Sequence, residues 1–160
     1  MKLRENISGF LRQPLFIRLW SLPLWFILGT AKIIIFKISF KKFGPWLGGV
    51  AGINPWVPLL TSDQEARALN IGRAVRITAQ YTPWDSNCFP QAIAARLLLG
   101  LYGIPYVMYF GLMRDPTSGD MKAHAWVCAG SIRVTGGYSF NDFKVVGCFA
   151  SKTLQGVIEP

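Results

Sequence analysis

A cysteine at the start of a predicted helix is the first residue of this sequence that could do chemistry. Cys88 follows the turn-forming stretch "TPWDSN", and residues 89–102 have the apolar spacing of a helix. Pro90 is tolerated only in a first helical turn, and Gly103 is a typical stop signal, so Cys88 is expected at or beside the N-cap. The dipole and free N–H groups of a helix start favour a thiolate. Cys88 is therefore a candidate nucleophile.

The one histidine of the chain, His124, is the candidate base. It lies in "KAHAWVCA", which has the composition of a strand, so it shares a face with Lys122, Trp126 and Cys128. An imidazole beside a thiol can take its proton and deliver it to a leaving amine. The alternative is that the cysteine and the histidine are ordinary packing residues, because cysteine is among the most buried residue types. Spacing alone leaves both possibilities open.

The elements that must position these two residues fall into two groups along the chain. We predict two helices over residues 11–42, broken near Pro23, and a helix over 63–79 that opens with a Ser62–Glu65 capping box. Gly72 is a weak point within it, and "GPWLGGVAGINPWVP" between these helices is typical of a linker.

The second group of elements consists of strands. They are predicted at residues 106–113, 122–129, 132–135 and 143–150, where aromatic and β-branched residues gather between polar or glycine-rich turns. Cys128 and Cys148 lie inside two of these strands, so we interpret both as core residues. Helices first and an antiparallel sheet afterwards indicate an α+β fold.

The positive charge of the chain belongs to its first third. Residues 1–52 hold eight Lys and Arg against Glu5, whereas residues 53–160 are close to balanced. We therefore predict a basic, apolar helical segment over 1–52 and a second domain over 53–160. The basic residues of "KIIIFKISFKKF" alternate with Ile and Phe, which disfavours nucleic-acid binding and suits packing on the domain, on a partner or on a membrane surface.

Composition also limits cofactors and location. The uncharged run between Arg18 and Lys32 is shorter than the roughly 20 residues that cross a membrane. Three cysteines make no even disulfide framework and show no paired metal spacing, so we expect no metal and no cofactor. With no cleavable signal sequence visible, we expect a cytoplasmic protein, with peripheral membrane contact left open.

Three blocks of the sequence resemble the leader peptidases of lasso-peptide biosynthesis. They are "CFPQAIAARLLLGLYGIPYVMYFGL", "AHAWVCAGSIRVTGG" and "FKVVGCFA", in this order, and the resemblance is good over residues 80–150. These peptidases are transglutaminase-like, papain-like cysteine peptidases in which a helix carrying the cysteine packs on an antiparallel sheet. They occur alone or fused to a leader-recognition module, and this chain is similar to the stand-alone form.

The resemblance implies roles for particular residues. Cys88 matches the nucleophile and His124 the base, but the acidic residue expected at the end of the next strand is missing. Asp142 is our first choice to orient the imidazole, with Asn141 or a backbone carbonyl as alternatives. For the oxyanion hole we expect the Cys88 N–H, and the candidate side-chain donors are Gln80 and Gln91.

The expected function is removal of the leader from a lasso-peptide precursor by a cysteine peptidase. The resemblance implies three partners: the precursor peptide, a small leader-recognition protein and an ATP-dependent lasso cyclase that closes the freed core. Residues 11–48 could dock the recognition protein. Two alternatives stay open. One is a non-catalytic membrane-surface or scaffold protein of the same fold, and the other is a thiol acyltransferase that uses an amine instead of water.

Overall fold

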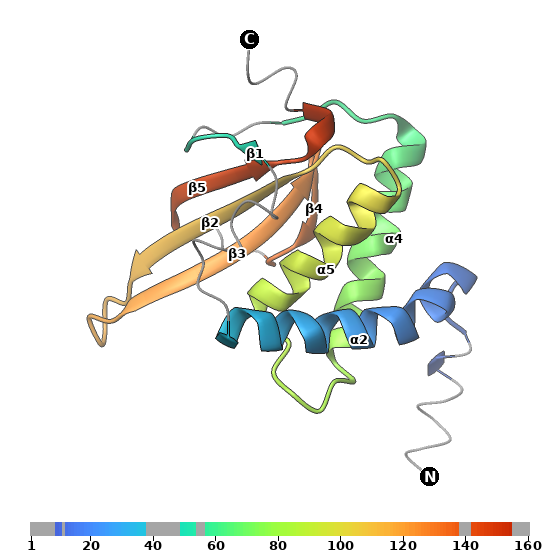
Figure 1. Ribbon diagram of the computed structural model, residues 1–160, viewed down its shortest axis with the longest axis horizontal. Coiled ribbons are helices and arrows are strands. Elements are labelled where there is room, and N and C mark those ends of the chain that lie inside the picture. The colour runs from blue at the N-terminus through green and yellow to red at the C-terminus, as the bar shows by residue number, and fades with distance from the viewer. Residues whose placement is uncertain (1–8, 11, 38–48, 54–56, 138–141, 155–160) are drawn as a thin grey trace.

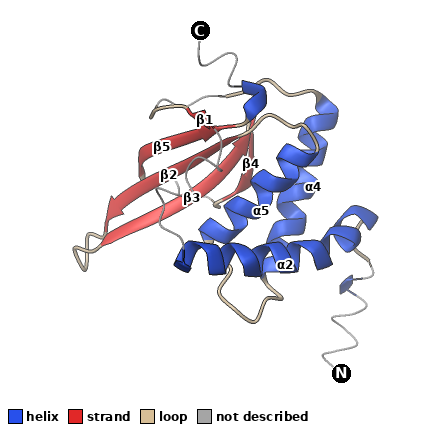
Figure 2. Ribbon diagram, in the orientation of Figure 1, coloured by secondary structure: helices blue, strands red, loops and turns tan. Residues whose placement is uncertain are grey.

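The computed structural model describes residues 9–10, 12–37, 49–53, 57–137 and 142–154. It contains three main helices on one side of an antiparallel sheet (Figures 1 and 2), which confirms the α+β prediction. In chain order the elements are α2 (Leu15–Lys37), β1 (Gly49–Val50), α4 (Ser62–Ala79), α5 (Cys88–Leu101), β2 (Val107–Arg114), β3 (Met121–Ala129), β4 (Ile132–Thr135) and β5 (Lys144–Ala150).

The sheet has the strand order β1-β5-β2-β3-β4. Strands β2, β3 and β4 follow one another as neighbours, and β5 then returns to pair with the free side of β2. The four longer strands lie within about one residue of their predicted positions. The short strand β1 was not predicted, because it lies in the glycine- and proline-rich stretch that indicated a linker, and only its pairing with β5 defines it.

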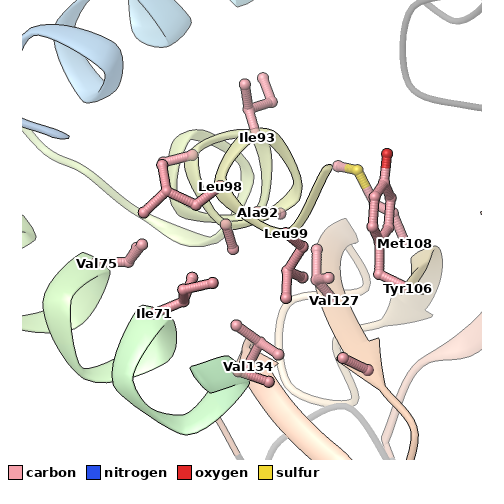
Figure 3. Close-up of a cluster of buried hydrophobic side chains, with 14 of the residues drawn as sticks. Ile71, Val75, Ala92, Ile93, Leu98, Leu99, Tyr106, Met108, Val127 and Val134 are labelled. Carbon is pink, nitrogen blue, oxygen red and sulfur yellow. The ribbon is translucent and has the colours of Figure 1, made fainter. Parts of the chain in front are cut away.

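The two faces of the sheet contact different partners. Ala125, Val127 and Phe149 belong to the large core that the sheet shares with the helices, part of which is shown in Figure 3. Trp126 and Cys148 belong to a smaller apolar cluster on the opposite face, where Tyr109 stacks on Trp126. This division follows from the alternation of side chains along a strand, and it decides on which side the site residues lie.

Helix α2 differs from its prediction. It runs without interruption through Pro23, where we expected a break between two helices. Proline removes one helical hydrogen bond, but Pro23 is exposed, so the unpaired carbonyl of the preceding turn can reach water. The fully buried side chains of Ile17, Leu24 and Leu28 hold both halves in the same core as α4 and α5. The packing on both sides of Pro23 keeps the helix in one piece.

Helix α4 confirms the predicted helix but shifts its cap by one residue. The N-cap is Thr61, whose hydroxyl accepts from the Gln64 N–H at 3.3 Å, while the Gln64 side chain accepts from the Thr61 N–H at 3.0 Å. The predicted Ser62–Glu65 box has the same chemistry in the neighbouring register. Gly72 lies where β4 crosses this helix, since a Cβ there would be 2.6 Å from the Val134 carbonyl oxygen. A close approach of backbone explains this glycine.

Candidate active site

Cys88 is the first residue of helix α5 and is half-buried. Hydrogen bonds of side-chain hydroxyls stabilise the loop before Cys88: Thr82 Oγ1 lies 2.9 Å from both the Trp84 carbonyl oxygen and Ser86 Oγ. Asn87 occupies the N-cap position but its side chain makes no capping hydrogen bond. The N–H groups of the first turn are therefore not occupied by a side-chain cap, and they could stabilise a nearby oxyanion.

The two glutamines considered for the oxyanion hole lie in different settings. The Gln91 amide donates to the Ser86 carbonyl oxygen at 2.6 Å, which ties the first turn of α5 to the loop before Cys88. Gln80 is exposed at the end of α4. In this structure Gln91 serves to hold the loop, and the role of either residue in an oxyanion hole stays a prediction.

The other two cysteines are held as neutral thiols. Burial raises the pKa of Cys148 to about 11 and that of Cys128 to about 11, the latter against the opposing charge of Arg133. Cys148 is fully buried, and Cys128 packs against the same apolar cluster. A protonated thiol is a poor nucleophile, so neither residue competes with Cys88 for this role at neutral pH.

The imidazole of His124 is fixed on three sides. Its ring lies against Trp126, with centroids 5.7 Å apart, and against Phe143 at 4.9 Å. Its Nε2 atom is 2.8 Å from the carbonyl oxygen of Gly136. A carbonyl oxygen can only accept, so Nε2 carries the proton and Nδ1 is left with the free lone pair in the neutral ring. Of the three orienting groups considered, this contact corresponds to the backbone carbonyl.

Gly136 can adopt this position because it has no side chain. Its φ of +99° lies in the region that favours glycine, and a Cβ there would collide with the Cβ of Trp126. In the sequence, Gly136 stands near the end of the strand after His124, where the resemblance implies an acidic residue that this chain lacks. The signal that could have identified its role is the glycine pair that ends the strand after His124.

Asp142 is exposed, and no hydrogen bond between it and the imidazole occurs among the residues that the structure describes. Asn141, the other candidate side chain, lies outside the described residues. The assignment of Asp142 as the orienting residue stays a prediction. The observed contact between Nε2 and the Gly136 carbonyl can orient the imidazole in its place.

Cys88 and His124 approach the same stretch of the sheet from different faces. Phe89 packs edge-on against Phe110 with ring centroids 5.2 Å apart, and Phe110 is the register partner of Ala125. The start of α5 thus lies one residue along β3 from His124. The imidazole, however, projects to the opposite face with Trp126, and no hydrogen bond joins it to the Cys88 thiol within the described part of the chain.

Strand β4 does not pair with β3 beside His124. The pairing along this edge of β3 begins only at Val127. Contact between the imidazole and the thiol would have to be made around this edge, and the joint action of the two residues stays a prediction. Among the described residues no cluster of His, Cys, Asp and Glu is suited to a metal ion.

Comparison with known families gives one match. A family model described as the transglutaminase-like superfamily matches residues 35–148, which include both Cys88 and His124 and cover well over half of the chain. Searches of the curated proteins and of the solved structures found no match.

Proposed function

The chain belongs to the transglutaminase-like superfamily, which includes cysteine peptidases and acyltransferases, and from this premise we propose that it is a cysteine peptidase. Cys88 is the nucleophile and His124 the base. The observation that supports this assignment best is the tautomer of His124: the Gly136 carbonyl holds the proton on Nε2, which leaves Nδ1 as the basic nitrogen. Cys88 stands at a helix start without a side-chain cap, where backbone N–H groups can stabilise an oxyanion.

The proposed reaction has two steps. The Cys88 sulfur attacks the carbonyl carbon of the scissile amide, while Nδ1 takes the thiol proton and passes it to the departing amine. Water then attacks the thioester, loses a proton to Nδ1 and releases the carboxylic acid, and the proton returns to the thiol. The Nε2–H to Gly136 bond persists in the imidazolium form and stabilises its charge.

This mechanism requires the thiol and the imidazole to come within hydrogen-bond distance. Catalytic hydrogen bonds are commonly long or misaligned before substrate binds. We propose that bound substrate completes the pair at this edge of β3, which β4 does not pair with beside His124. Cys88 is only half-buried as a residue, which supports this approach.

The proposed substrate is the leader–core junction of a lasso-peptide precursor. The support is the resemblance of the three sequence blocks around Cys88, His124 and Cys148 to the stand-alone leader peptidases. A small leader-recognition protein would present the precursor, and an ATP-dependent cyclase would use the freed core. Asp142 remains the proposed side-chain alternative to the Gly136 carbonyl as the group that accepts from the Nε2–H.

The first experiment is alkylation of the folded 160-residue chain with iodoacetamide over a range of pH, with the labelled sites located by mass spectrometry. We expect Cys88 to label at neutral pH at least about tenfold faster than Cys128 and Cys148, whose raised pKa keeps them protonated. His124→Ala should slow the labelling of Cys88 only. Equal labelling of all three cysteines would reject the peptidase.

A second candidate function is favoured by one observation. The imidazole and the start of α5 lie on opposite faces of β3. A protein that keeps the fold but does not use Cys88 and His124 for catalysis would tolerate this separation. Such a scaffold would show fast labelling of no cysteine. A thiol acyltransferase would pass the labelling test but, given a precursor peptide and an added amine, would yield the amide in place of the free acid.

A further inference from the structure

Helix α2 is apolar on the side that faces away from the core. A row of side chains at helical spacing points to solvent from this side and is more than half exposed: Leu15, Leu19, Leu22, Phe26 and Ile33. We call this row the α2 stripe. Core helices that pack on a domain from one side ordinarily present polar residues on the other. An apolar face of this length indicates that another apolar surface covers it.

The charges around the α2 stripe are all of one sign along the helix. Arg12 and Arg18 lie toward its N-terminal end, Lys32 and Lys37 toward its C-terminal end, and α2 contains no acidic residue. In the loop before α5, Asp85 is an exposed acidic residue next to Trp84. An apolar band between cations complements a layer of acyl chains under anionic headgroups.

Two apolar grooves run along the sides of Trp25 and Phe26 at the α2 stripe. One, of about 510 Å³, is formed with Gly29, Ile33 and Trp84, and Lys32 and Lys37 also line it. The other, of about 640 Å³, is formed with Leu22 and Tyr81, and Arg18 also lines it. Trp and Tyr are the residues that membrane interfaces prefer. Each groove combines apolar walls with a cation, as an amphiphilic chain would require.

Helix α2 lies on the domain and does not pass through a bilayer in this arrangement. By length and composition alone, Leu15–Ile35 could cross a membrane, although a core helix or a signal sequence would pass the same test. In the structure Ile17, Leu24 and Leu28 are fully buried in the core with α4 and α5. Only the outer face is available, so the helix can lie in the interface plane.

We propose that the α2 stripe, with the two grooves beside it, docks the protein on the surface of an anionic lipid bilayer. The loop that carries Tyr81 and Trp84 leads directly to Cys88, so the same surface would hold the start of α5 close to the headgroups. This proposal does not depend on the chemistry of Cys88, because a non-catalytic protein of this fold would dock in the same way.

The test is co-sedimentation of the full chain with sucrose-loaded vesicles of phosphatidylcholine, with and without phosphatidylglycerol. We expect the protein to sediment with the anionic vesicles at low salt and to bind more weakly at high salt, because salt screens the headgroup charge. Lys32→Gln should weaken binding about fivefold, the amount expected for one cation at an anionic surface. The double variant Leu22→Glu/Phe26→Glu should weaken it more than tenfold.

The matched control is Val57→Glu/Leu59→Glu, which adds the same charge at two exposed apolar residues outside α2. It should sediment like the wild type, and circular dichroism should show that both double variants fold. A wild type that stays in the supernatant with anionic vesicles overturns the proposal. So does a lipid-free dimer, seen by light scattering, that dissociates in Leu22→Glu/Phe26→Glu, because a second copy would then cover the stripe.

Cys88→Ala separates this proposal from the peptidase. The variant should bind vesicles like the wild type, whatever it does to processing. If Cys88→Ala loses processing and keeps vesicle binding, the docking proposal stands by itself. If the wild type does not bind vesicles although its Cys88 labels fast, only the docking proposal fails.

Discussion

The Nε2 atom of His124 lies 2.8 Å from the carbonyl oxygen of Gly136, and the same glycine lies so close to Trp126 that an added Cβ would collide with the Trp126 Cβ. Gly136, which has no side chain, thus orients the imidazole and also lies close against Trp126. A carboxylate at this place would accept the same proton with a full negative charge, whereas the neutral carbonyl accepts it through an ordinary hydrogen bond. The orientation of His124 therefore depends on the backbone conformation at Gly136.

Gly136→Ala should displace the imidazole and destabilise the protein. The added Cβ collides with Trp126 at a φ of +99°, and overpacking with backbone strain together should lower the free energy of unfolding by about 3 kcal/mol. The His124 ring nitrogens, observed by ¹⁵N NMR, should lose the single Nε2–H tautomer.

The matched control for Gly136→Ala is Gly137→Ala. Gly137 also has a positive φ, of +64°, but nothing lies within 4 Å of a Cβ there. This variant should lose only about 1 kcal/mol and keep the tautomer. If both variants retain the tautomer, the Gly136 carbonyl does not orient the ring.

Cys88→Ala and Cys128→Ala should separate chemistry from packing. Cys88→Ala should abolish cleavage of a precursor peptide with little loss of stability, since its side chain is only half-buried. Cys128→Ala should lower the urea midpoint, because Cys128 packs against the cluster around Trp126, and should cleave normally per folded molecule. Activity is measured by mass spectrometry of the peptide, and equal loss in both variants would contradict the assignment of Cys88.

The buried thiol of Cys148 should make stability depend on pH in the alkaline range. Burial raises its pKa from about 9 to about 11, so the unfolded chain loses this proton at lower pH than the folded one. The contribution is complete below about pH 9 and is lost as the pH rises to about 11. Two pKa units correspond to at most about 2.7 kcal/mol.

The measurement for Cys148 is urea unfolding at pH 8 and at pH 11 for the wild type and for Cys148→Ala. The variant is expected to be less stable at pH 8, because the substitution leaves a cavity, but its free energy of unfolding should fall less between the two pH values. Parallel losses in both proteins would mean that Cys148 ionises equally in the folded and unfolded states.

Local signals in the sequence predicted most of the fold. The prolines and glycines around α5 place Cys88 at a helix start, and the alternation in β3 places His124 with Trp126, as the structure has them. What the sequence could not supply is long-range. Strand β1 exists only through its pairing with β5, and the continuity of α2 through Pro23 depends on packing against α4 and α5.

The same limit applies to the candidate site. Spacing brings Cys88 and His124 to one region of the sheet, but which face each residue uses depends on where α5 packs. That position is set by tertiary contacts such as Phe89 on Phe110. A backbone carbonyl was expected only as an alternative to Asp142 and Asn141, because every residue has a carbonyl and only the folded backbone shows which one reaches the imidazole.

Gly72→Ala should destabilise the protein although alanine is the better helix former. A Cβ at Gly72 would be 2.6 Å from the Val134 carbonyl oxygen, which also accepts from the Arg76 guanidinium at 3.1 Å. Strand β4 would have to move away from α4, and overpacking is expected to lower the free energy of unfolding by about 2 kcal/mol.

The matched control is Gly100→Ala. Gly100 also lies in a helix, but nothing lies within 4 Å of the new Cβ, so this variant should raise the free energy of unfolding by up to about 1 kcal/mol. Urea unfolding of Gly72→Ala and Gly100→Ala should show a lowered free energy of unfolding for the first variant and a raised one for the second. A stabilised Gly72→Ala would mean that β4 is not held against this helix as closely as the structure has it.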